Sequence, residues 1–147
     1  MKILFAILIS LFTFISPLLG EEKTSLIVYT YDSFNTEWGP GPKIEKAFEE
    51  GCNCDLKFVS AGDGAALLAK IRLEGEKTKA DVVLGLDSNV LEEARKTKLF
   101  LPYSLNIELD LPIQWKDDTF LPFDWGFFAF VFDGSKTKKI PQSFREL

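Results

Sequence analysis

A strand buried on both faces is predicted by Ser25-Leu-Ile-Val-Tyr-Thr-Tyr31, a short run in which apolar, aromatic and β-branched residues predominate. Loop and helix signals follow it. The segment 32–41 contains serine, asparagine, glycine and proline, and Pro42 then fixes a helical φ at the first position of a helix that ends near Gly51. These signals predict a first step from strand to helix.

The same alternation of strand and helix occurs twice more. A strand over 55–60 leads into the turn Ala61-Gly-Asp-Gly64 and a helix over 65–74, with Gly75 as its stop. The run 80–87 predicts a third buried strand, and the residue at 87 or 88 caps a third helix that extends to about residue 98. Such alternation predicts an α/β fold, with a parallel sheet covered by helices on both faces. Ligands of open α/β sheets bind at the edge where the loops after the strands lie.

The last part of the chain predicts one more strand and the start of another helix. The apolar run 127–132 reads as a strand that is followed by a turn at Asp133-Gly134. Ser143 and Glu146 have the spacing of a capping box. No internal repeat and no long linker divides this organisation.

Residues 1–20 have the pattern of a secretory signal peptide. Lys2 is followed by an apolar run and by a small residue, Gly20, after which we expect the cut. The alternative is an uncleaved membrane anchor, but the apolar run is shorter than the ~20 residues that span a bilayer, and Pro17 interrupts its end. We therefore expect an exported protein.

Composition narrows the possible functions. The 147 residues include 17 basic and 22 acidic side chains and no histidine, and the net charge is -5. A nucleic-acid binder needs a basic surface that displaces phosphate counterions, so we expect no nucleic-acid partner. The two cysteines, Cys52 and Cys54, form a local disulfide or remain two thiols. As a zinc site they lack two further soft ligands, so no metal is expected.

Candidate ligand-binding residues follow the first two predicted strands. Aromatic and acidic side chains occur together there: Tyr29, Tyr31, Asp32, Phe34, Trp38 and Asp63. Aromatic faces beside carboxylates suit an organic cation, because the ring quadrupole and the negative charge both attract a positive centre. The structural alternative is that the rings belong to the core and that Asp63 is a helix N-cap.

An enzyme is less well supported than a binding protein. The chain has no histidine, no Gly-x-Ser-x-Gly motif and no evident base beside its cysteines, so no activated nucleophile is indicated. Phosphate-loop and dinucleotide signatures are also missing from the sequence.

Several motifs, taken in order, resemble one family. They are Tyr29-Thr-Tyr-Asp-Ser-Phe34, Trp38-Gly-Pro-Gly-Pro42, Cys52-Asn-Cys54, Asp63-Gly64, Lys79-Ala-Asp-Val-Val-Leu-Gly-Leu-Asp87, Thr119-Phe-x-Pro-Phe-Asp124 and Phe128-Ala-Phe-Val131. In this order they resemble the periplasmic thiamine-binding proteins, the solute receptors of thiamine ABC transporters. The resemblance covers nearly all of the chain after residue 20.

The resemblance implies a periplasmic binding protein of type II. Residues 21–124 would form its N-terminal lobe, and residues 125–147 a hinge-crossing strand and the truncated start of a second lobe. The protein would bind thiamine or its phosphate esters in the periplasm and deliver them to an inner-membrane permease with its ATPase, with no cofactor, no metal and no catalysis.

The resemblance also names site residues and leaves alternatives. Asp63 and Gly64 match ligand-contacting positions, and Tyr31 and Trp38 would form aromatic walls. Members of the family are about twice as long as a single lobe, so a fragment, a truncated reading frame or a split gene is expected here. The alternatives are a thiaminase-like enzyme with a cysteine nucleophile, or a receptor for another organic cation such as a polyamine, or for iron.

Overall fold

The computed structural model describes residues 23–136 and 139–146. The signal peptide predicted over 1–20 lies outside these residues. The chain divides after Phe100 into two compact units, which are described separately. No helix in the described ranges is long and apolar enough to cross a membrane.

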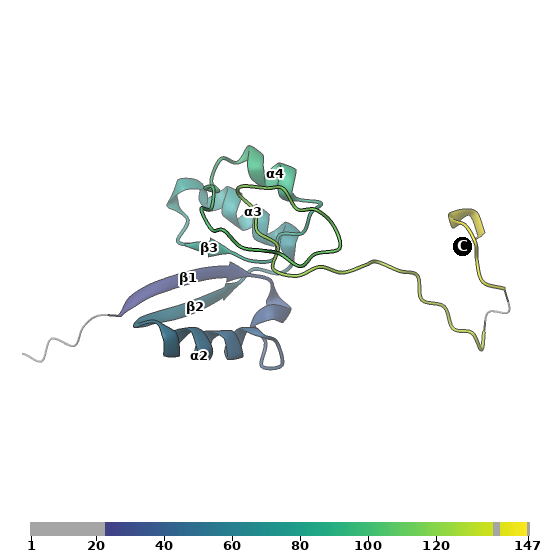
Figure 1. The fold of residues 1–147 in the computed structure, drawn as a ribbon, viewed down its shortest axis with the longest axis horizontal. Coiled ribbons are helices and arrows are strands. Elements are labelled where there is room, and N and C mark those ends of the chain that lie inside the picture. The colour runs from purple at the N-terminus through teal and green to yellow at the C-terminus, as the bar shows by residue number, and fades with distance from the viewer. Residues whose placement is uncertain (1–22, 137–138, 147) are drawn as a thin grey trace, which may run out of the picture. The chain divides into compact units, whose positions relative to one another are not determined.

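The first unit contains a parallel sheet of three strands, as the sequence predicts (Figure 1). The strands are β1 (Thr24–Thr30), β2 (Cys54–Ser60) and β3 (Val82–Val83), and their order in the sheet is β2-β1-β3. β1 and β2 pair along their whole length, from Thr24 opposite Cys54 to Thr30 opposite Ser60. β1 is therefore the central strand, which explains why its sequence is apolar on both faces.

Helices connect these strands. They are the 3₁₀ helix η1 (Asp32–Asn35), α2 (Gly41–Gly51), α3 (Gly64–Glu74), the 3₁₀ helix η2 (Gly75–Lys77) and α4 (Leu91–Lys96). Pro42 lies in the first turn of α2, and Gly75 ends α3 with a φ of +55°, so both of these sequence signals are confirmed. α2 lies on one side of the sheet and α3 on the other (Figure 1).

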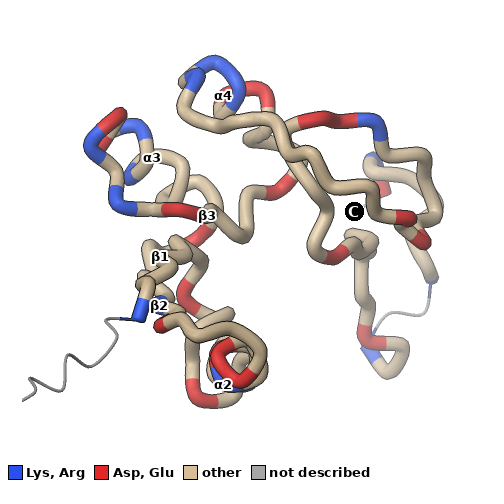
Figure 2. Tube along the Cα trace, turned by 60° about the vertical axis from the view of Figure 1, so that its left-hand side comes forward, with Lys and Arg blue, Asp and Glu red and all other residues tan. Residues whose placement is uncertain are grey.

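Successive side chains of β1 supply the two sides of the core, because neighbouring residues in a strand point to opposite faces. Tyr29 packs with Leu67 and Ile71 of α3. Val28 points to the opposite face, where Leu56 and Phe34 are also buried. Charged residues of both signs are interspersed along the helices, which Figure 2 shows for α4.

The third strand and the third helix are shorter than predicted. Pairing with β1 continues one residue beyond each end of β3, through hydrogen bonds from Asp81 N to Ile27 O (2.9 Å) and from Leu84 N to Tyr29 O (2.9 Å). The strand then ends because Gly85 has a φ of +108°, which takes the backbone out of the extended conformation. A turn at 87–90 follows, so α4 begins at Leu91 and its N-cap is Val90 rather than residue 87 or 88.

The second unit, from residue 101 onward, has little regular secondary structure in its described part. Two hydrogen bonds join segments of this unit, from Tyr103 N to Asp118 O (2.8 Å) and from Trp115 Nε1 to Phe120 O (2.8 Å). The strand predicted over 127–132 is not formed among the described residues. A strand needs a partner that pairs with its backbone, and here the apolar side chains are exposed instead, with Phe127 at 82%. The helix predicted near the end is one 3₁₀ turn, η3 (Phe144–Glu146).

Candidate functional site

The loops after β1 and β2 are tied together at the carboxyl edge of the sheet. Asp32 N donates to Gly62 O at 2.8 Å, and Gly62 N donates in return to Asp32 Oδ1 at 2.8 Å. Ala61 N also donates to Thr30 O at 3.0 Å. The turn that precedes α3 is therefore held in register with the end of β1.

Asp63 is the N-cap of α3. Its Oδ1 accepts a hydrogen bond from Ala66 N at 2.9 Å, so the structural alternative given for this residue is confirmed. Its side chain is exposed at the sheet edge, and its Oδ2 accepts no hydrogen bond within the described part of the chain. The capping role therefore occupies only one of the two carboxylate oxygens.

Gly64 lies against the segment that follows β3. A Cβ atom at this position would be 2.7 Å from Gly85 O and 3.7 Å from Asp87 Oδ2. Real Cβ atoms do not approach a backbone oxygen so closely, so only glycine allows this contact. The first turn of α3 is thereby brought against the loop after β3.

Tyr31 follows β1 directly, and its half-buried ring rests on the core. It makes an edge contact with the ring of Phe34, with 5.6 Å between the centroids and 69° between the planes. Phe34 is completely buried and makes a similar contact with Phe58 at 5.3 Å. Tyr31 is therefore the end of a row of three rings, in which Phe34 and Phe58 support it from the α2 side of the sheet.

Trp38 lies in the segment between η1 and α2 and is 79% exposed. A hydrogen bond from Gly39 N to Thr36 O at 3.0 Å shapes this segment. No described contact joins Trp38 to Asp63 or Gly64. The structure thus brings Asp63, Gly64 and Tyr31 to one edge through shared neighbours, and leaves Trp38 exposed on its loop.

The position of this edge in the topology favours ligand binding. After β1 the chain passes to β2 on one side of the sheet, and after β2 it crosses to β3 on the other side. The strand order therefore reverses between β1 and β3, which is where open α/β sheets bind ligands. Tyr31 directly follows β1, and Gly85 lies shortly after β3.

Sequence reasoning missed Gly85. A Cβ atom on this residue would overlap Cδ1 of the Tyr31 ring and would lie 2.9 Å from its Cε1. The available signal was a single glycine inside an otherwise apolar strand pattern, which marks a bulge or a close approach of another group.

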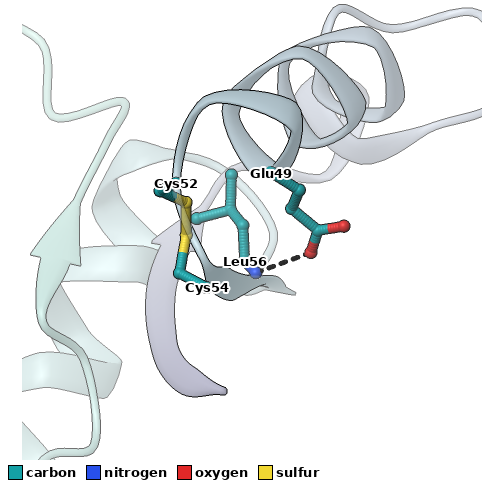
Figure 3. The surroundings of a disulfide bond; sticks show 4 residues. All are labelled: Glu49, Cys52, Cys54 and Leu56. Atoms are coloured by element: carbon teal, nitrogen blue, oxygen red, sulfur yellow. Dashed lines mark hydrogen bonds between the residues drawn. A yellow bond between two sulfur atoms is a disulfide. The ribbon is translucent and has the colours of Figure 1, made fainter. Parts of the chain in front are cut away.

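The two cysteines form a disulfide, with their Cα atoms 5.2 Å apart, which decides between the two alternatives that the sequence leaves open (Figure 3). The disulfide joins the end of α2 to the start of β2. Beside it, Leu56 N donates to Glu49 Oε1 at 2.8 Å. Because β2 begins here, this cluster lies at the amino end of the sheet, away from the candidate site.

Two features elsewhere in the described residues also concern ligand binding. Among the described residues, no group of three or more His, Cys, Asp or Glu side chains is arranged to hold a metal ion. An open cavity of about 580 Å³ lies within residues 107–116 of the second unit and contains none of the candidate residues.

Comparison with known proteins identifies similar proteins of known name. No protein-family model matches the chain. The thiamine-binding periplasmic protein of Salmonella typhimurium is 56% identical over 126 residues, which cover 85% of this chain and 38% of the relative. The protein of the same name from Haemophilus influenzae is 46% identical over 149 aligned positions, which cover 100% of this chain and 45% of the relative.

A solved structure agrees in fold. The structure of a periplasmic thiamin binding protein matches with a TM-score of 0.76 and 53% identity over 86% of this chain. Over most of its length, this chain is similar to periplasmic thiamine-binding proteins. The resemblance seen in the sequence is therefore confirmed, and the chain spans less than half the length of the relatives it matches.

Proposed function

We propose that this chain is part of a periplasmic receptor that binds thiamine or its phosphate esters. The observation that carries the proposal is the 56% identity to a thiamine-binding periplasmic protein over 85% of the chain. The edge geometry supports it, because three of the residues that match the family lie at the topological switch point. Residues 21–124 would then be the N-terminal lobe of a type II binding protein, and 125–147 would cross toward a second lobe.

The chemistry of the edge suits thiamine, which carries a cationic thiazolium ring and an amino-bearing pyrimidine. The free carboxylate oxygen of Asp63 attracts a positive or amino-bearing group. The rings of Tyr31 and Trp38 offer faces for stacking and for cation–π attraction, which is worth about 0.5–2 kcal/mol for each ring. The missing side chain of Gly64 lets the segment after β3 pack against the first turn of α3, beside Asp63.

Binding without catalysis is the function we propose, followed by delivery to a permease with its ATPase. A thiaminase-like enzyme would need a cysteine nucleophile, but both cysteines of this chain are joined in the disulfide at the opposite end of β2. The relatives named above are binding proteins, which agrees with this choice.

Isothermal calorimetry with thiamine tests the proposal. Two forms are titrated: the chain itself, and a chimera that adds the part of the Salmonella relative that the chain does not cover. In the form that binds, Asp63→Asn keeps an N-cap residue but removes the charge, so we expect at least a roughly tenfold loss of affinity. Asp55→Asn, at the other end of β2, is the matched control and should leave affinity unchanged.

The alternatives give different results in the same experiment. Absence of heat with both forms refutes thiamine binding. Release of free thiazole when an external amine is added indicates the thiaminase-like enzyme instead. Full displacement of thiamine by an equimolar polyamine indicates a receptor for another organic cation.

A further inference from the structure

Gly85 is unusual because two independent features forbid a side chain there. Its φ of +108° is a conformation that L residues rarely adopt. In addition, a Cβ atom would overlap Cδ1 of Tyr31 and would lie 2.9 Å from Cε1 and 3.3 Å from Cγ of the same ring. The second feature means that the Tyr31 ring occupies the space that a side chain at 85 would need.

Gly75 shows that these two features are separable. It also has a positive φ, of +55°, but a Cβ atom built on it would have no neighbour within 4 Å. Backbone strain alone would therefore affect both glycines, whereas displacement of an aromatic ring would follow only from a change at Gly85.

The surroundings of Gly85 link it to two candidate residues at once. Its carbonyl oxygen is the nearest neighbour of Gly64 in α3, and its Cα hydrogen faces the ring of Tyr31. The same ring also contacts Phe34, which is completely buried and cannot move aside without cost. The ring therefore packs against both a rigid core residue and the backbone at Gly85.

We propose that Gly85 is a positioning residue of the ligand site: by having no side chain, it fixes where the Tyr31 ring lies relative to Gly64 and Asp63. This inference rests on the proposed thiamine function. A ring held in place before the ligand arrives costs less conformational entropy on binding than a ring that must be ordered. Displacing it removes both the stacking face and this preorganisation.

A double-mutant cycle measured by thiamine calorimetry tests this role in the form that binds. We expect Gly85→Ala to weaken binding at least roughly tenfold and Gly75→Ala less than about twofold, since only the former displaces the ring. Tyr31→Ala should weaken binding by itself. In the Tyr31→Ala background, Gly85→Ala should cause almost no further loss, because no ring is left to displace.

A second measurement needs no ligand and so remains available if Gly85→Ala fails to fold. In NMR spectra of the whole chain, the ring current of Tyr31 should move the chemical shift of one Gly85 Hα away from the value usual for glycine. Tyr31→Phe should keep this displacement, and Tyr31→Ala should abolish it.

The outcomes separate the two proposals. Suppose that wild type binds thiamine but that the losses of affinity from Gly85→Ala and Tyr31→Ala simply add. The positioning role is then overturned while the receptor function stands. The same conclusion follows if the chemical shift of the Gly85 Hα is unchanged in Tyr31→Ala. If no form binds thiamine, the proposed function fails, and the role of Gly85 in it fails too.

Discussion

Replacing Phe34 with leucine should lower the free energy of unfolding by about 1–3 kcal/mol. Phe34 is completely buried and makes two edge-on ring contacts, with Tyr31 at 5.6 Å and with Phe58 at 5.3 Å. Each such pair contributes about 0.5–1.5 kcal/mol beyond the burial of its surface, and leucine keeps most of the apolar volume while losing both pairs. Alanine would cost about 3–5 kcal/mol, a large share of the stability of an ordinary domain, so leucine gives the clearer measurement.

Urea unfolding followed by far-UV circular dichroism measures this change. Trp38→Leu is the control, since that ring is 79% exposed and its removal should change stability by less than about 0.5 kcal/mol. If Phe34→Leu changes the free energy of unfolding as little as this control does, Phe34 does not anchor the row of rings. The argument that the core holds Tyr31 in place is then refuted.

Three further predictions concern the opposite end of the sheet and α3. The hydrogen bond from Lys70 is the main reason that the pKa of Glu74 is lowered from its ordinary value of 4.5. The stability that this carboxylate contributes should therefore be complete above that pH and be lost as the pH falls through the lower pKa of the folded state. Glu74→Gln should remove this contribution, so the urea midpoint of the variant should depend less on pH. Glu49→Ala removes the acceptor of Leu56 N, so exchange of that amide should accelerate and stability should fall by about 1 kcal/mol, whereas Glu50→Ala should change neither. The disulfide after α2 spans a sequence separation of 2, so its reduction should cost only about 1.6 kcal/mol in urea unfolding, and a loss above about 3 kcal/mol would contradict the loop-entropy argument.

Local signals predicted the first unit well. Pro42 at the start of α2, Gly75 at the end of α3 and the apolar run of β1 each act through the conformation of a few neighbouring residues, and the structure agrees with all three. The parallel sheet followed from their alternation, because parallel strands need a crossover connection and a helix usually supplies it.

Features that depend on distant partners were predicted less well. The run 127–132 has the composition of a strand, but composition does not supply a neighbouring backbone, and no strand forms there among the described residues. The early end of β3 depends on the conformation of Gly85, and the sequence marks that glycine without saying which group approaches it. The Tyr31 contact becomes visible only when β1 and β3 are known to be neighbours with Tyr29 opposite Val83.

The candidate site is built on contacts that a side-chain pattern does not reveal. Asp32 holds Gly62, Gly64 meets Gly85, and Gly85 faces the ring of Tyr31, so each contact between the three loops involves a glycine or the backbone. Close backbone packing leaves little room for the loops to shift independently. Trp38 has no such restraint on its ring. Under the proposed function, in which Trp38 also contacts thiamine, the ligand would meet one wall that is already ordered and one aromatic ring that must be ordered on binding. Replacing Trp38 should thus reduce ligand affinity while leaving the unfolding free energy nearly unchanged, whereas replacing any of the glycines should reduce both.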